Sequence, residues 1–132
     1  MRTGSLLTVL LFLTTLINAQ TRTSVQSGDW DDSDTWDCSC TPSSGENVVI
    51  ASNHVVTLGG NETITDVTIN SDGTLNGANK ELTITGNLVV NGALTGDKAV
   101  FMTGTNATID GSGSINNKKQ LKLKDGDKTI LS

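Results

Sequence analysis

Three segments in the second half of the chain repeat one pattern, and this repeat restricts the fold more than any other feature of the sequence. Each segment holds a short run of β-branched or aliphatic residues, an Asn or Asp, a turn containing Gly, and then another aliphatic residue. Equivalent positions recur at intervals of 19 or 21 residues. A period near 20 with short strands and Gly corners indicates a β-solenoid, in which each coil covers the inner face of its neighbours. The two inward columns predicted in this way are Ile69, Val90 and Ile109, and Leu75, Leu94 and Ile115.

The remaining composition agrees with an all-β solenoid of about four to five coils, each of roughly 20 residues, over residues 46–132. No window of eleven or more residues after the N-terminal leader has helical periodicity. Short strands at regular spacing also occur in β-sandwiches. The aromatic residues that a sandwich core would use are scarce, since only Trp30, Trp36 and Phe101 follow the leader. A solenoid is therefore preferred.

Residues 1–19 have the pattern of a secretory signal peptide. Arg2 supplies a positive start, residues 6–16 are mostly apolar, and Ala19 before Gln20 fits a cleavage site. We therefore expect a secreted or cell-surface protein. Removing Arg2 leaves 8 basic and 14 acidic residues, a net charge of −6, and this acidic balance argues against a nucleic-acid partner.

Residues 20–45 are interpreted as a polar lead-in followed by a cap rich in Trp, Cys and Asp. Residues 20–28 lack periodicity and are expected to be a mobile lead-in that contains Arg22. Trp30 and Trp36 are expected to cover the open end of the first coil while the neighbouring acidic residues stay in water. A repeat array needs such a cap, because its terminal coil otherwise exposes an apolar cross-section.

Part of this region resembles a known family. Trp30, the Thr35–Trp36 pair, Pro42, and the strands at 45–50 and 55–58 resemble the start of the eight-glycine domain. They are also similar to related N-terminal β-helical regions of secreted bacterial surface proteins. The resemblance covers about residues 28–117 and implies a right-handed parallel β-helix in an extracellular or cell-surface setting, with a carbohydrate as a conceivable partner. It supplies no set of catalytic residues.

Cys38 and Cys40 are the only cysteines. An even number of cysteines in a secreted chain favours a disulfide, although a bridge between positions i and i+2 requires a sharp bend at Ser39. Free or intermolecular thiols are the alternative. A zinc site is disfavoured, because zinc takes four ligands and His54 is the only imidazole.

A cluster of carboxylates in the cap is a candidate calcium site, since Ca²⁺ binds several carboxylate oxygens. The cluster lacks the residue order of a known calcium loop, so a solvated cap is the preferred interpretation. No other cofactor is predicted. The candidate calcium ligands are Asp29, Asp31, Asp32 and Asp34.

Three Thr pairs recur at a period of 20 and are predicted to stack as two columns on one outer face. Such arrays resemble the ice-binding surfaces of some antifreeze proteins, although Thr also suits any exposed strand position. Exposed Trp30 or Trp36 would instead serve a carbohydrate-binding module by stacking on sugar rings. The Thr pairs are Thr63 and Thr65, Thr83 and Thr85, and Thr103 and Thr105.

Four lysines gather near the C-terminal end of the repeats. Lysine on a terminal strand discourages pairing with another chain, which is the preferred interpretation. The alternative is a head-to-tail contact with the acidic cap of a second copy. These lysines are Lys118, Lys119, Lys122 and Lys124.

The sequence as a whole predicts a secreted or cell-surface, non-catalytic β-helical structural or adhesion module. Its partner would be a cell-surface glycan or another surface protein. Carbohydrate binding and ice or crystal-surface binding are the alternative functions. An enzyme is not predicted, because a pair of cooperating carboxylates requires two acids at a short separation. The acids of the coils are spread singly, at Asp66, Asp72, Glu81, Asp97 and Asp110.

Overall fold

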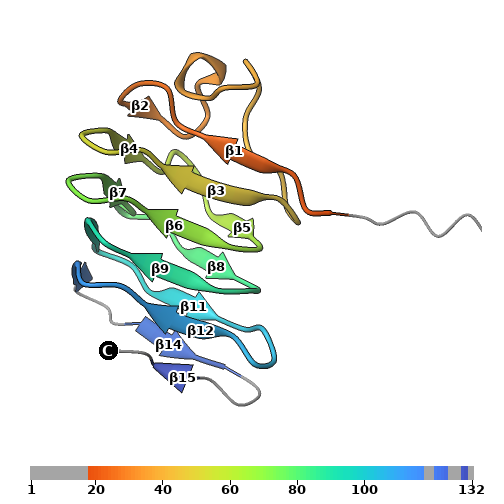
Figure 1. The fold of residues 1–132 in the computed structure, drawn as a ribbon, viewed down its shortest axis with the longest axis vertical. Coiled ribbons are helices and arrows are strands. Elements are labelled where there is room, and N and C mark those ends of the chain that lie inside the picture. The colour runs from red at the N-terminus through yellow and green to blue at the C-terminus, as the bar shows by residue number, and fades with distance from the viewer. Residues whose placement is uncertain (1–17, 118–120, 125–128, 131–132) are drawn as a thin grey trace, which may run out of the picture.

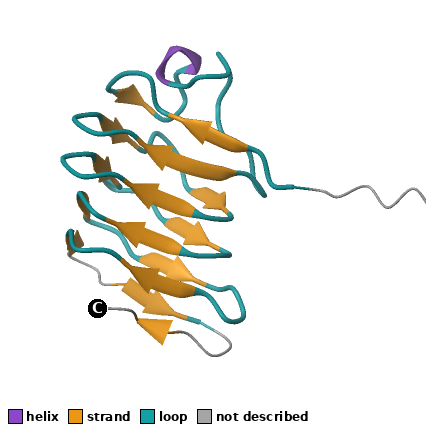
Figure 2. Cartoon of the chain, viewed as in Figure 1, coloured by secondary structure: helices purple, strands orange, loops and turns teal. Residues whose placement is uncertain are grey.

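The computed structural model describes residues 18–117, 121–124 and 129–130, and these form an all-β solenoid of about three turns (Figure 1). Helix is confined, in this part of the chain, to one 3₁₀ turn, η1 (Ser33–Thr35), at the N-terminal end (Figure 2). None of the described residues belongs to a helix long and apolar enough to cross a membrane. Residues 1–17 of the predicted leader, and Lys118 and Lys119, lie outside the described residues.

Three parallel sheets run along the solenoid, and each complete turn adds one strand to every sheet (Figure 1). We call them sheets I, II and III in the order in which the chain visits them. Sheet I has 6 strands in the order β1-β3-β6-β9-β12-β15, and all pairings are parallel. They are β1 (Thr21–Thr23), β3 (Asn47–Ile50), β6 (Val67–Ile69), β9 (Leu88–Val90), β12 (Thr108–Asp110) and β15 (Thr129–Ile130).

Sheets II and III have 5 and 4 strands. Strand order follows chain order in both, so every strand stacks on its equivalent in the next turn. Sheet II consists of β2 (Gly28–Asp29), β4 (Val55–Thr57), β7 (Thr74–Asn76), β10 (Ala93–Gly96) and β13 (Ser114–Asn117). Sheet III consists of β5 (Glu62–Ile64), β8 (Leu82–Ile84), β11 (Val100–Met102) and β14 (Leu121–Leu123).

Alternation along the strands directs aliphatic side chains inward, where they stack in columns between turns. The predicted column in sheet II is confirmed, because Leu75 lies opposite Leu94 and Leu94 opposite Ile115. Leu75 and Leu94 are both 0% exposed. Burying a side chain of this size contributes about 1.5–3 kcal/mol, so these columns supply the main stabilising term of a chain with few rings.

The predicted column in sheet I is correct for its first two members and wrong for the third. Ile69 lies opposite Val90, but Ile109 lies opposite Leu88. The turn that connects β9 to β12 is therefore 21 residues long, whereas the spacing of Val90 and Ile109 is 19. Continuing this register places Gly111 opposite Val90, where a Cβ would lie 2.1 Å from the Val90 carbonyl oxygen. Only glycine tolerates this close approach, which its φ of +114° accompanies.

The solenoid begins well before residue 46. Residues 20–28 are not a mobile lead-in, because Thr21–Thr23 pair in parallel with Asn47–Val49 and Gly28 pairs with Val56. The polar composition hid these strands, since the first turn has a cap above it and does not need two apolar faces. The boundary predicted between 20–45 and 46–132 is therefore not the start of the solenoid.

Side-chain hydrogen bonds connect successive turns at the corner that leads into sheet I. Asn47 Oδ1 accepts from the Asp66 backbone N–H at 3.2 Å, and Asp66 Oδ1 accepts from the Asn87 N–H at 2.7 Å. Asn87 Oδ1 in turn accepts from the N–H and the hydroxyl of Thr108, at 2.9 and 3.0 Å. The recurring Asn or Asp of the repeat thus satisfies backbone donors where the chain leaves one sheet for the next.

Candidate functional site: the capped end and the Phe101 face

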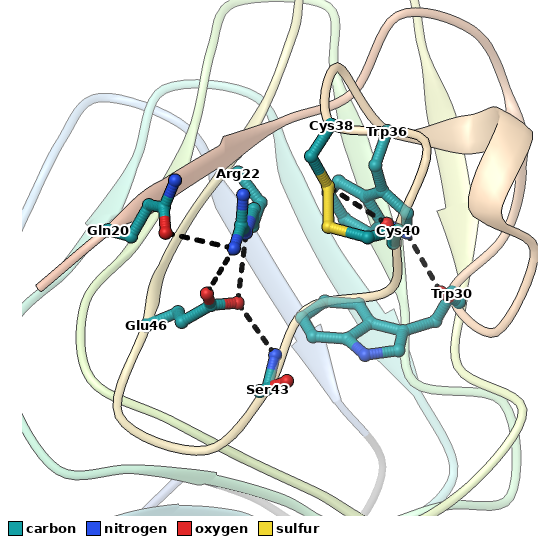
Figure 3. The surroundings of a disulfide bond; sticks show 8 residues. All are labelled: Gln20, Arg22, Trp30, Trp36, Cys38, Cys40, Ser43 and Glu46. Carbon is teal, nitrogen blue, oxygen red and sulfur yellow. Dashed lines mark hydrogen bonds and ion pairs between the residues drawn. A yellow bond between two sulfur atoms is a disulfide. The ribbon is translucent and has the colours of Figure 1, made fainter.

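The N-terminal end of the solenoid is covered by residues 30–46, which we call the cap. The cap follows β2 and takes the place that a strand of sheet III would occupy in the first turn (Figure 1). Trp30 and Trp36 are each 1% exposed and meet edge to face, with ring centroids 5.1 Å apart and planes at 76°. Trp36 Nε1 donates to the Trp30 carbonyl oxygen at 2.8 Å (Figure 3).

The cap also covers the edge of sheet I. Ser24 and Trp36 form an antiparallel bridge. The Val25 N–H donates to the Thr35 carbonyl at 2.8 Å, and the Asp37 N–H donates to the Thr23 carbonyl at 3.0 Å. A free strand edge is a template for pairing with another chain, so these bonds protect β1 from such pairing.

Burial of both indoles bears on the carbohydrate-binding hypothesis. Stacking on a sugar ring requires an exposed aromatic face, and neither Trp30 nor Trp36 presents one. The assignment of these two residues as sugar platforms is therefore wrong for this structure. Their rings close the apolar end of the solenoid and belong to its core.

Cys38 and Cys40 form a disulfide, with their Cα atoms 5.1 Å apart (Figure 3). Ser39 between them has φ +51°, the left-handed conformation that supplies the sharp bend expected from the sequence. Cys38 packs against the buried core beside the tryptophans. The bridge therefore fixes the segment that follows Trp36 over the end of the solenoid.

A charged pair joins the cap to β1, and the sequence gave no warning of it. Arg22 Nε donates to Glu46 Oε2 at 3.0 Å, a second bond links Arg22 to Glu46 Oε1, and Gln20 accepts from Arg22 at 3.1 Å (Figure 3). Glu46 Oε2 also accepts from the Ser43 N–H at 2.8 Å. The hydrogen bond from Arg22 lowers the pKa of Glu46, and the bond to Glu46 raises the pKa of Arg22. Only the pairing of β1 with β3 reveals that Arg22 and Glu46 are neighbours.

The carboxylates of the cap do not form the predicted calcium site. Within the described residues, no three His, Cys, Asp or Glu side chains are placed to hold a metal ion. Asp29, Asp31, Asp32 and Asp34 are exposed, and Asp32 Oδ1 accepts from the Asp34 N–H at 2.9 Å as the N-cap of η1. The acidic residues therefore end a 3₁₀ turn and solvate the cap.

One acid near the cap is partly withdrawn from solvent. Glu62 begins β5, the first strand of sheet III, and its side chain lies near Asp31. Burial raises the pKa of the Glu62 carboxyl, and the negative charge of Asp31 raises it further.

His54 is hydrogen bonded to a serine from the first turn. Ser24 Oγ and His54 Nδ1 are 2.9 Å apart, and Ser24 Oγ also accepts from the Ala51 N–H at 2.9 Å. Ser24 is 2% exposed, so its hydroxyl is withdrawn from any substrate in solution. The pair ties the end of β1 to the turn between β3 and β4.

The Thr array forms only in part. Thr63 and Thr83 are opposite each other on the outer face of sheet III, and Thr65 and Thr85 continue beside them. The third rank differs from the prediction, because Phe101 and not Thr103 lies opposite Thr83. The cause is turn length: β8 to β11 spans 18 residues, against 20 from β5 to β8. Thr103 therefore continues the column of Thr85, and Thr105 lies in the turn beyond it.

Phe101 and two lysines form a cluster that the sequence analysis missed. Lys122 lies opposite Phe101 in the parallel register of β11 and β14, and Lys124 follows on the same face. Their Nζ atoms are 5.5 and 5.4 Å from the centroid of the Phe101 ring. The signal in the sequence was an aromatic residue at an outward position of a Thr column, which becomes visible only when β11 is aligned by its true spacing.

Comparison of the chain with protein-family models, with curated protein sequences and with solved structures found no match. The resemblance to the eight-glycine domain therefore rests on the residues of the sequence that carry it.

Proposed function

We propose that the protein is a secreted or cell-surface β-helical module with a non-catalytic, structural or adhesive role. The observation that carries the proposal is the disulfide-closed cap on a parallel β-solenoid. Such a scaffold presents its outer strand faces at fixed positions, and its contacts lie between neighbouring turns. The partner would be a cell-surface glycan or another surface protein.

The disulfide supports the extracellular setting. Cys38 and Cys40 are bonded to each other, and disulfides persist in oxidising compartments such as the cell exterior. The signal-peptide pattern of residues 1–19 agrees with this, and cleavage is proposed near Ala19–Gln20.

A non-catalytic role is supported by what the reactive groups do. The Ser24 hydroxyl is buried between His54 and a backbone N–H, Glu46 is paired with Arg22, and Asp66 binds the Asn87 N–H at a corner. Each of these groups has a structural task that uses its polar atoms.

The proposal includes a finer architecture. We infer a right-handed helix, since parallel strands in one sheet are almost always joined by right-handed crossovers. Counting the incomplete turns at both ends gives four to five coils, with β1 and β2 in the first and β12 to β14 in the last.

Expression of the full chain with its leader in a secreting host tests this proposal. We expect the extracellular product to begin near Gln20, and its intact mass to be lower by two hydrogens than the mass of the reduced chain. A Cys38→Ser/Cys40→Ser variant is the control for the mass difference. A product that stays inside the cell with residues 1–19 attached would contradict the proposal.

A further inference from the structure

The outer face of sheet III changes its chemistry along the solenoid. One column runs Thr63, Thr83, Phe101 and Lys122, and successive rungs are about 4.8 Å apart. The column beside it continues from Thr85 through Thr103 to Lys124. Hydroxyl groups thus lead to an aromatic ring, and the ring leads to two ammonium groups.

The ring has an unusual position for this chain. Phe101 lies on an outward face and is only partly buried, whereas the tryptophans, the other two rings of the described residues, are fully buried in the cap. Both lysines are exposed, and their charged ends lie within 5.5 Å of the ring centroid. A cation–π contact at an exposed site is worth about 0.5–1 kcal/mol, enough to favour these positions over free rotation of the side chains.

Two positive charges held beside one ring favour an anionic ligand. The ring restricts both ammonium groups before binding, which reduces the entropy cost of ordering long side chains. The acidic cap does not cancel this local field. The first and last strands of sheet III are three rungs apart, roughly 14 Å at 4.8 Å per rung, and the Debye length is about 8 Å at physiological salt.

From this arrangement we propose that the Phe101 face, defined as Thr83, Phe101, Thr103, Lys122 and Lys124, binds an acidic polysaccharide whose sugars carry carboxylates. The lysines pair with carboxylates, the ring contacts the apolar face of a sugar, and the Thr hydroxyls exchange hydrogen bonds with sugar hydroxyls. The face is an open strand surface, and the described residues enclose no pocket. An extended polymer that crosses several rungs suits such a surface, because several weak contacts act together. The assignment names a site and is independent of the module role proposed above.

A binding measurement at physiological salt tests the site. The full chain, secreted and purified, is titrated with polygalacturonate, with neutral dextran, and with vesicles containing phosphatidylserine. We expect binding to polygalacturonate that weakens as salt is raised, and at most weak binding to dextran and to the vesicles. No binding to polygalacturonate, or equal binding to dextran, would overturn the proposal.

Two variants separate charge from ring contact. Lys122→Gln/Lys124→Gln is expected to weaken polygalacturonate binding about tenfold, since two exposed ion pairs contribute up to about 1 kcal/mol each. Phe101→Thr leaves the net charge unchanged and restores the residue type of the preceding rungs. It is expected to weaken binding about threefold or more through loss of the ring and of the lysine positions.

The matched control removes the same charge elsewhere. Lys80→Gln/Lys98→Gln alters two lysines of the turns that precede sheet III, and it is expected to change the affinity by less than about twofold. Thermal unfolding of each variant verifies that the fold is retained. Equal losses in the control and in the Lys122/Lys124 variant would show a nonspecific charge effect and overturn the site. Tight vesicle binding that the Phe101-face variants abolish would instead identify the face as a membrane contact.

Discussion

At the scale of single residues, the cap depends on whether buried polar atoms are paired. Trp36 Nε1 has an acceptor in the Trp30 carbonyl, whereas Trp30 Nε1 is buried and finds no acceptor among the described residues. Both rings fill similar space in the same cluster, and they differ in this one hydrogen bond. The two tryptophans are therefore expected to respond differently to the same substitution.

Trp36→Phe should lower the free energy of unfolding by about 1–2 kcal/mol more than Trp30→Phe. The first change leaves the Trp30 carbonyl without its buried donor, and the second removes a donor that has no protein partner. Urea unfolding of both variants measures the difference. An equal loss would mean that ring volume alone decides the contribution of these residues.

Glu46 makes the protein sensitive to acid. Arg22 lowers the pKa of Glu46 below its unfolded value of 4.5, so the folded state favours the ionised carboxyl. Its contribution is fully present above pH 4.5 and is lost as the pH falls through the lower folded pKa. Glu46→Gln should therefore reduce stability at pH 7 and flatten the acid limb of the unfolding midpoint plotted against pH.

Glu62 should show the opposite sign. Burial and Asp31 raise its pKa above 4.5, so ionisation opposes folding above the folded pKa, and the penalty is relieved as the pH falls through that value. Glu62→Gln should raise the unfolding midpoint at pH 7 and leave it unchanged well below pH 4.5. A loss of stability at neutral pH would contradict the burial of this carboxylate.

At the scale of elements, the cap replaces a strand and must close the solenoid without a regular ladder. It does so with the tryptophan pair, the bridge to β1, the Arg22–Glu46 pair and the disulfide. The disulfide encloses only three residues and restricts the unfolded chain little, so its effect on global stability should be modest.

Cys38→Ser/Cys40→Ser should lower the free energy of unfolding by about 1.5 kcal/mol, the loop-entropy value for so short a ring. The same loss should follow from reduction of the unaltered protein, and a reducing agent should leave the variant unaffected. Urea unfolding with and without reductant measures both. A loss of several kcal/mol would show that the bridge holds the tryptophans in place.

At the scale of the whole molecule, stability is a sum of contacts between neighbouring turns. The register makes each turn interchangeable where its inner residues match. Val67 and Leu88 are equivalent positions, one turn apart, as are Ile69 and Val90. Removal of one whole turn should therefore rejoin compatible strands.

Deletion of residues 67–87 should give a shorter folded solenoid, because Leu88 then follows Asp66 as Val67 does now. Deletion of residues 67–86 differs by one residue and should be much less stable, since a one-residue slip directs inward side chains outward. Far-UV circular dichroism and urea unfolding compare the two. Equal stability would show that the turns absorb a slip of one residue.

The sequence by itself determined the solenoid class, the aliphatic interior, the near absence of helix and the Cys38–Cys40 pairing. These follow from local information: a repeat period, strand alternation and two cysteines that can meet only at a sharp bend. The tertiary structure decided the register, because turns between equivalent strands of sheet III vary from 18 to 21 residues and no average period reveals which turn is short. For the same reason, only the structure moved Thr103 out of its predicted rank, paired Arg22 with Glu46, and brought Phe101 beside Lys122 and Lys124.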